Sequence, residues 1–225
     1  MKSMRFVITV FTGLILIQPI ANGQSKLSLS ISLAPEYAHN RFSTVVPVFG
    51  SPSPGFTNLE SKSYVLSYTF GLMARYSFSE KWSATSGIWA SHPFTGKESH
   101  VVGNQTFSTP LRFNDPFEIR LRIPLRVNFR PSTNRISPYI SAGTTFDFRP
   151  KVYLDVNGDG IEERVRFGKS VTLTPIVGIG GIVDLKKNLS LVVQPTFQYL
   201  IQSQEGYNYR RAYIVGLQGQ LLYRF

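Results

Sequence analysis

The chain has 225 residues, contains no cysteine and carries a formal net charge of +11. Its length suits one domain with a large sheet, and the lack of cysteine excludes disulfide and thiolate chemistry. The positive charge favours anionic partners such as lipid headgroups or lipopolysaccharide phosphates. Nucleic acid is not an expected partner of an exported chain without a basic run.

Residues 1–23 have the layout of a secretory signal peptide. Lys2 and Arg5 precede an apolar stretch from Phe6 to Ile20, and the small residues of Ala21-Asn22-Gly23 follow it. This apolar stretch is shorter than the roughly 20 residues that a membrane-spanning helix needs. We therefore expect cleavage before Gln24 and one domain over residues 24–225.

The remainder of the chain alternates between apolar and polar residues with a period of two, which predicts strands and not helices. The alternation predicts eight strands: Lys26–Ala38, Tyr64–Phe78, Trp82–Ser91, Phe117–Arg130, Ile136–Phe148, Val171–Leu185, Leu189–Ile201 and Ala212–Phe225. Pro124, Pro175 and Pro195 fall inside strands, where each removes a hydrogen-bond donor. We expect bulges or register irregularities at these three prolines.

Short turns and long loops alternate between the predicted strands. The turns are residues 79–81, 131–135 and 186–188, and the long loops are residues 39–63, 92–116, 149–170 and 202–211. An even number of strands with short turns at one rim and long loops at the other is typical of bacterial outer-membrane barrels. Outward aromatic residues near both rims predict two girdles at the membrane interfaces.

The segment from Gly216 to Phe225 alternates strictly and finishes on an aromatic residue. It resembles the C-terminal β-signal that the barrel-assembly machinery recognises. With the strand and turn rhythm, the chain resembles the outer-membrane β-barrel domain family of the PorT and OmpA/OmpX type. This resemblance implies an all-β fold, an eight-stranded antiparallel up-and-down transmembrane β-barrel. It further implies a monomer in the outer membrane of a Gram-negative cell, in contact with outer-membrane lipids and lipopolysaccharide, with no cofactor.

The predicted lumen face is rich in charge. Its inward-facing residues are Glu118, Arg120, Arg122, Arg126 and Arg130 of one strand, with Arg75, Arg224, Glu36, Asp147 and Asp184 from others. Eight strands enclose just enough space for side chains, so these charges predict a paired plug, although the excess of arginine leaves a narrow anion path open. We expect Asp147 near Arg120 and Arg122, and Asp184 near Arg75, Arg126, Arg130 and Arg224.

One loop segment resembles the start of a calcium-binding loop. Asp155, Asn157 and Asp159 with Gly160 match its first positions, but Arg166 occupies the place of the bidentate glutamate. An Asn-Gly/Asp-Gly hairpin turn explains the same residues, so no metal site is predicted. A second loop segment, Phe42 to Phe56, is unusually apolar and either covers the barrel mouth or contacts a partner.

The sequence contains no convincing catalytic constellation. His39, His92 and His100 fall on predicted outer loops, and Ser91 precedes His92, but no third orienting group is identifiable. No catalytic, cofactor-binding or metal-binding residue is therefore predicted. The sequence favours a non-enzymatic barrel whose outer loops serve surface contacts, envelope integrity or an accessory role in export. The alternative is a small anion-selective channel.

Overall fold

The computed structural model describes residues 26–48, 55–102, 105–111, 119–148, 152–154, 163–165, 170–201 and 208–225. The predicted signal peptide and its cleavage site lie outside these residues. Within them the regular elements are eleven β-strands. No helix in the described part of the chain is long and apolar enough to cross a membrane.

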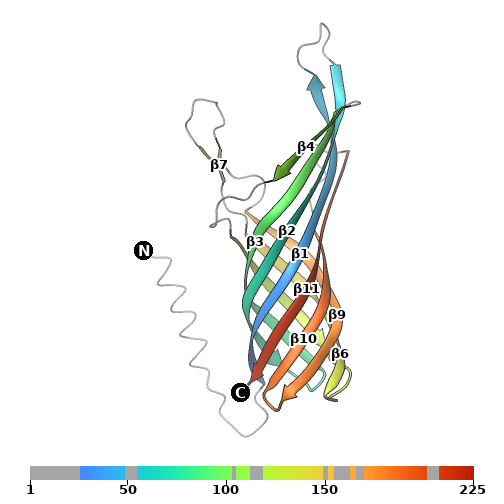
Figure 1. Cartoon of the computed structure of the whole chain (residues 1–225). Helices are drawn as coiled ribbons and strands as arrows, with labels where there is room; N and C mark the ends of the chain where they lie inside the picture. Colours follow the sequence, from blue (N-terminus) through green and yellow to red (C-terminus); the bar gives the residue numbers. More distant parts are fainter. Residues whose placement is uncertain are drawn as a thin grey trace.

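Eight strands close into a ring (Figure 1). They are β1 (Leu27–Val48), β2 (Gly55–Ser77), β3 (Trp82–Val102), β5 (Arg120–Phe129), β6 (Ile136–Phe148), β9 (Val171–Lys186), β10 (Leu189–Tyr199) and β11 (Tyr209–Arg224). Each strand pairs antiparallel with the next one in this order, and β11 pairs with β1 to complete the ring. The predicted eight-stranded antiparallel up-and-down barrel is therefore confirmed.

Three further strands lie outside the ring. β4 (Gln105–Leu111) pairs with the upper part of β3, and β7 (Val152–Leu154) pairs with β8 (Glu163–Val165) as a separate hairpin. The three predicted short turns are confirmed.

The first two predicted long loops are wrong. Residues 39–48 continue β1, residues 55–63 begin β2, and residues 92–102 continue β3. These segments are rich in Ser, Thr and Pro and lack a continuous apolar face, so alternation alone did not identify them. Their backbone groups pair across the strands without interruption from Leu27 opposite Tyr76 to Val48 opposite Gly55. We call the parts of β1, β2 and β3 beyond Tyr37, Tyr64 and Phe94, together with β4, the outer extension.

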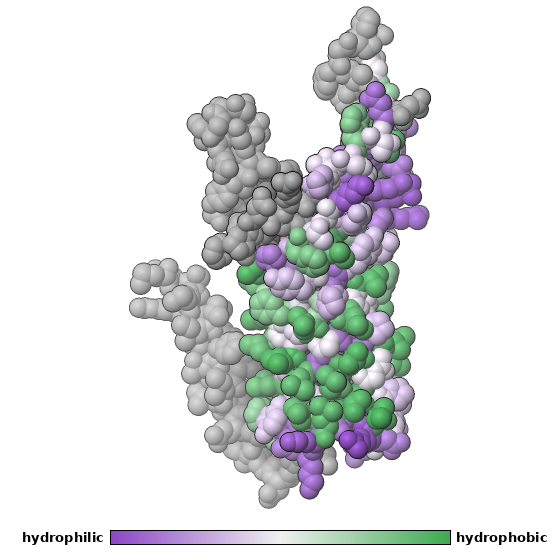
Figure 2. Space-filling model, viewed as in Figure 1, coloured by the Kyte–Doolittle hydropathy of each residue, from purple (hydrophilic) through white to green (hydrophobic). Residues whose placement is uncertain are grey.

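Alternate side chains face the lumen and the surrounding lipid. On β2 the apolar residues Leu72 and Tyr76 are exposed, whereas Thr69, Met73 and Arg75 are buried inside the barrel. Figure 2 shows the result on the visible face as a hydrophobic band across the lower part of the molecule, with hydrophilic side chains above it. Such a band favours lipid, because its apolar side chains avoid water there. A closed barrel can enter lipid because it leaves no unpaired backbone group facing the hydrocarbon.

Aromatic side chains mark both ends of this band. At the turn end they are Tyr76, Phe78, Trp82, Phe129, Tyr223 and Phe225; at the opposite end they include Tyr37, Tyr64, Tyr68, Phe148, Tyr199 and Tyr213. Tyr64 and Tyr76 are twelve residues apart on β2. At about 3.4 Å per residue and a tilt of about 40°, they are separated by about 31 Å across the membrane. This matches a hydrocarbon core of about 30 Å, so the chain is a transmembrane barrel of the outer membrane.

The predicted irregularities at the strand prolines are wrong. Pro124 lies opposite Thr145, and Pro195 lies opposite Leu217, both in unbroken register. A residue in an antiparallel strand directs its N–H and C=O to one neighbouring strand, so a proline loses its bond on one side only. Pro195 accordingly keeps its pairing with β11 and has none with β9. The register shifts occur elsewhere, at Leu66/Ser67 and Leu189/Ser190.

Several of the described glycines lie where adjacent strands approach too closely for a side chain. A Cβ atom at Gly87, Gly143 or Gly180 would lie 2.1 Å from a backbone carbonyl oxygen of the neighbouring strand. The strands of a narrow barrel coil tightly, and a missing side chain permits that bend.

Replacing Gly143 by alanine should lower the free energy of unfolding by about 1–3 kcal/mol, the usual cost of forcing a carbon into a packed interior. Gly181→Ala is the matched control, because its added Cβ would meet its nearest atom at an ordinary 3.8 Å. Urea unfolding in lipid vesicles, followed by heat-dependent gel mobility, measures both variants. Equal urea midpoints for the two variants would contradict this account of the strand packing.

Candidate functional site

The barrel interior holds the densest group of charges in the described part of the chain. Five arginines and three carboxylates face it: Arg75, Arg122, Arg126, Arg130 and Arg224, with Glu36, Asp147 and Asp184. Arg122, Arg126 and Arg130 are four residues apart on one face of β5 and its end. They divide the interior into three layers along the barrel axis, which we call the outer, central and turn-side layers.

In the outer layer, Arg122 lies between two carboxylates. Its Nη2 donates to Glu36 Oε2 at 2.5 Å, and its Nε lies 3.8 Å from Asp147 Oδ1. Thr69 donates to the same Glu36 oxygen at 2.9 Å, and Gln198 Nε2 donates to the other at 3.4 Å. Both partners of the Arg122–Glu36 pair are almost fully buried. Pairing of this kind offsets the cost of removing both charges from water.

In the central layer, a buried guanidinium has no carboxylate partner. Arg126 Nη1 donates to Gln218 Oε1 at 2.6 Å, and the Arg126 guanidinium lies 5.2 Å from the ring centre of Trp89. Trp89 Nε1 points at Met73 Sδ at 3.3 Å, and Gln194 donates to the same Gln218 oxygen at 2.8 Å. The aromatic face and the amide oxygen compensate the charge of Arg126, since desolvated cation–π contacts contribute up to about 2 kcal/mol.

In the turn-side layer, one carboxylate serves two arginines. Asp184 Oδ2 lies 2.7 Å from Arg130 Nη2, and its Oδ1 lies 2.9 Å from Arg224 Nη2. Arg75 lies over the ring of Tyr139 at 5.3 Å. Asp184 is about a quarter exposed, so this layer borders the turn-side opening of the barrel.

The central layer closes the lumen. Trp89, Arg126, Gln194 and Gln218 each expose 2% or less of their surface. The ring of Trp89 lies between the guanidinium groups of Arg126 and Arg122, the latter at 5.9 Å. An eight-stranded barrel is just wide enough for its side chains to fill, and here they fill it. In this conformation the lumen is a polar core with ion pairs in its outer and turn-side layers.

The predicted charge pairs are confirmed in part. Asp147 lies near Arg122, and Asp184 pairs with Arg130 and Arg224, as expected. The predicted proximity of Arg126 to Asp184 is wrong, because four residues of β5 place Arg126 about 13 Å farther from the turns than Arg130.

Two other predicted lumen charges do not join the layers. Arg120 is exposed at the end of β5, and Glu118 lies outside the described residues.

Sequence reasoning missed the central residue of the lumen. Trp89 was not singled out, although alternation from the lipid-facing Trp82 already assigns it to the inner face. In the same way, the alternation places Gln194 and Gln218 on the inner faces of their strands. Aromatic residues in membrane strands are usually interpreted as anchors at the membrane interface. An inward tryptophan is recognised only because the alternation along the strand places it on the inner face.

The histidines lie in strands, so their predicted place in loops is wrong. His39 of β1 and His92 of β3 stack on tyrosines of the outer aromatic belt, with ring centres 5.0 and 5.4 Å apart. His100 Nε2 lies 3.6 Å from Glu98 Oε2. Ser91 is buried on the inner face and His92 is on the outer face, so the two cannot act as a pair. Within the described residues, no group of three His, Cys, Asp or Glu could hold a metal ion.

Two predicted loop features fall partly or wholly outside the described residues. The calcium-like segment Asp155 to Gly160 lies wholly outside them. Of the apolar segment Phe42 to Phe56, only residues 49–54 lie outside the described residues. The residues on either side of them are paired strands of the outer extension.

A polar groove lies between the outer extension and the start of β11. It has a volume of about 460 Å³ and is lined by Arg41, Ser43, Thr57, Asn58, Glu60, Val101, Asn208 and Tyr209. Glu60 pairs with Arg41, and Tyr209 donates to Glu60 Oε1 at 2.5 Å. The hydrogen bond from Tyr209 and the pairing with Arg41 lower the pKa of Glu60, so this carboxylate is ionised at neutral pH.

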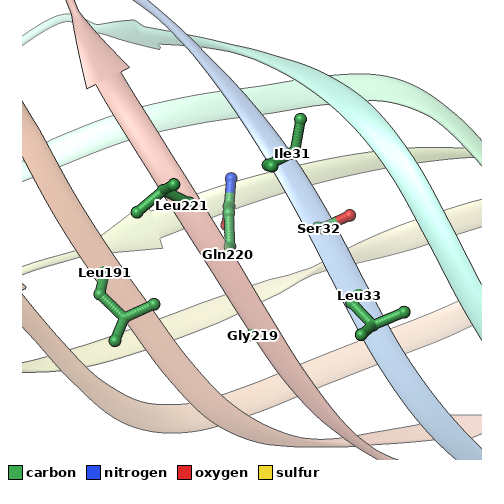
Figure 3. Close-up of a pocket in the computed structure, with 7 residues that line it drawn as sticks. All are labelled: Ile31, Ser32, Leu33, Leu191, Gly219, Gln220 and Leu221. Carbon is green, nitrogen blue, oxygen red and sulfur yellow. The ribbon is translucent and has the colours of Figure 1, made fainter.

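A second hollow faces the lipid at the seam between β1 and β11. Gly219 leaves a gap of about 240 Å³ among Ile31, Leu33, Leu191 and Leu221, as Figure 3 shows. These apolar side chains point outward from the barrel, so a lipid acyl chain can fill the gap. The inward-facing residues Ser32 and Gln220 also line it.

No family model matches the chain, and no curated protein matches it. Solved outer-membrane barrels are similar at low identity. OprG from Pseudomonas aeruginosa is 13% identical with a TM-score of 0.46, covering 90% of this chain and 98% of that one. The N-terminal barrel domain of Pseudomonas aeruginosa OprF is 13% identical with a TM-score of 0.44, covering 90% and 100%. Ail from Yersinia pestis is 14% identical with a TM-score of 0.37, covering 89% and 100%. At these values the likeness says nothing of function, and PorT-like membership stays a prediction.

Replacing Glu36 by alanine should lower the free energy of unfolding by about 3–5 kcal/mol, because it removes the nearer of the two carboxylates of the buried Arg122. Asp184→Ala should cost less, since its carboxylate is partly exposed and already screened by solvent. Glu80→Ala, in the exposed turn between β2 and β3, is the control and should stay within about 0.5 kcal/mol. Urea midpoints in lipid vesicles rank the three variants. No difference between Glu36→Ala and Glu80→Ala would mean that water already solvates Arg122.

Proposed function

We propose that this chain is a non-enzymatic outer-membrane barrel that acts through its outer extension and not through its lumen. The observation that carries the proposal is the closed central layer, where Trp89 and Arg126 expose 2% or less of their surface. The roles that fit a closed barrel are surface contacts, envelope integrity or an accessory part in export.

The unequal lengths of the strands support this proposal. β1, β2 and β3 have 22, 23 and 21 residues, whereas β5 has 10. A membrane strand needs about 9–11 residues, so each of the first three strands has about ten residues to spare. The surplus forms a hydrogen-bonded sheet above the barrel on one side (Figure 1). A sheet of this kind positions surface side chains more firmly than a loop does.

Other features fit the same proposal. Ser91 and His92 face opposite sides of β3, which disfavours a serine hydrolase at this rim. The closed ring leaves no unpaired edge within the membrane, which favours a monomer. The alternating last strand fits recognition by the barrel-assembly machinery, and the strand rhythm fits a PorT-like relative.

A small anion-selective channel is the second candidate. It is favoured by the excess of five arginines over three carboxylates in the interior. A channel would require Trp89 and Arg126 to leave the barrel axis together.

Planar-bilayer recordings distinguish the two candidates. We expect no reproducible conductance steps from the wild-type protein, because the central layer blocks the axis. The double variant Trp89→Ala/Arg126→Ala should produce steps, because it removes the two largest side chains of that layer. Heat-dependent gel mobility verifies that the double variant is folded.

The double variant also shows that the recording can detect a pore of this size. Reproducible wild-type steps that Arg122→Ala or Arg126→Ala abolishes would favour the channel and overturn the proposal.

A further inference from the structure

A row of basic side chains crosses the outer face of three neighbouring strands. Arg41 of β1 lies directly opposite Lys62 of β2 and directly opposite Arg211 of β11. All three side chains are exposed. Lys97 of β3 is also exposed and lies opposite Tyr64, two residues nearer the membrane than the β3 residue that faces Lys62. We call Arg41, Lys62, Lys97 and Arg211 the basic row.

This arrangement is unfavourable without an anion. Like charges directly opposite each other on a sheet destabilise it. Glu60 is the carboxylate that the described residues place beside the basic row: it pairs with Arg41 and lies 3.9 Å from Lys62. For Arg211 and Lys97 the described residues show no ion pair. The row therefore keeps three uncompensated positive charges on an exposed surface.

The height of the basic row matches the phosphates of the outer leaflet. Immediately below it, His39 lies opposite Tyr64 and Tyr213, which belong to the outer aromatic belt. Arg41, Lys62 and Arg211 are two residues farther along their strands, which places them about 5 Å beyond the belt at the usual strand rise and tilt. Lys97 lies level with the belt, opposite Tyr64. Aromatic belts lie at the headgroup level, so the row meets the charged part of the headgroups. Figure 2 shows hydrophilic side chains gathered above the hydrophobic band in this part of the molecule.

The polar groove continues upward from the same residues. It shares Arg41 with the basic row and adds Tyr209, Asn58 and Asn208, which offer an aromatic ring and amide groups. Rings and amides of this kind suit the faces and hydroxyls of sugars. A phospholipid headgroup would use the row but leave the groove empty, whereas a phosphorylated glycolipid would use both.

We propose that the basic row and the polar groove form a binding site for a phosphorylated glycolipid of the outer leaflet, with phosphate on the row and sugar in the groove. The chemistry is that of lipopolysaccharide, whose phosphates adjoin its acyl chains. Arg41 donates Nε and Nη2 to Glu60 and lies over the ring of Tyr209 at 5.4 Å, which fixes its position. The outer edge of its guanidinium, with Nη1, is left to donate to a phosphate. The inference requires the outer extension to face the outer leaflet but does not depend on a closed lumen. Its failure would therefore leave the proposed function standing.

The test measures lipopolysaccharide binding by the whole barrel in neutral detergent, by native mass spectrometry. The variant is Arg41→Gln/Lys62→Gln/Arg211→Gln. We expect its apparent affinity to fall on the order of 100-fold, because three cations at a headgroup are removed together. Lys81→Gln/Lys186→Gln/Lys187→Gln is the matched control: it removes the same charge from exposed turns at the opposite rim and should bind like the wild type.

The comparison ligands are lipopolysaccharide without its lipid A phosphates, phosphatidylglycerol and free inorganic phosphate. We expect each to bind the wild-type barrel at least tenfold more weakly than intact lipopolysaccharide. Equal binding of phosphatidylglycerol would show a general anionic-lipid surface, and equal binding of inorganic phosphate would show a free-anion site. Either result would overturn the proposal, as would an equal loss of affinity in the two triple variants.

Discussion

Backbone hydrogen bonding in lipid is the constraint on which this structure depends. Hydrocarbon offers no partner for an open strand edge, so the last strand must return to the first. β11 does so along β1, from Ser28 opposite Arg224 to Ser43 opposite Tyr209. Closure with eight strands fixes a narrow interior, and that narrowness decides what the lumen side chains can do.

The narrow interior explains the pairing of its charges. Guanidinium groups at this depth cannot be solvated by bulk water, so each needs a partner from another strand. Arg122 has Glu36, and Arg130 has Asp184. Two buried arginines have an aromatic face and a neutral oxygen instead: Arg126 with Trp89 and Gln218, and Arg75 with Tyr139 and Ser83. With the interior occupied in this way, the surfaces left for recognition are the outer extension and the face toward the headgroups.

Much of this fold could be predicted from the sequence, because lipid on one side and a polar core on the other impose a strict period of two. That period located all eight barrel strands, their short turns and the inward face of Arg122. It did not reveal the outer extension, where polar residues such as Ser43 and Ser61 are buried and no apolar face alternates with a polar one. It did not reveal which charges pair either, since Glu36 and Arg122 are far apart in sequence and meet only across the closed ring. The basic row was invisible for the same reason: its members come from separate strands.

The most direct test of the closed lumen uses the two tryptophans of the chain. Trp82→Phe leaves Trp89 as the single tryptophan, which is excited selectively over the tyrosines at long wavelength, and Trp89→Phe leaves Trp82, which lies on the lipid-facing side at the turn end. In vesicles, brominated lipid should quench Trp82, and neither brominated lipid nor aqueous iodide should quench Trp89. The test is sensitive because an open lumen rich in arginine would attract iodide. Iodide quenching of Trp89 approaching that of free tryptophan would show that water and anions reach the central layer, and would contradict the account.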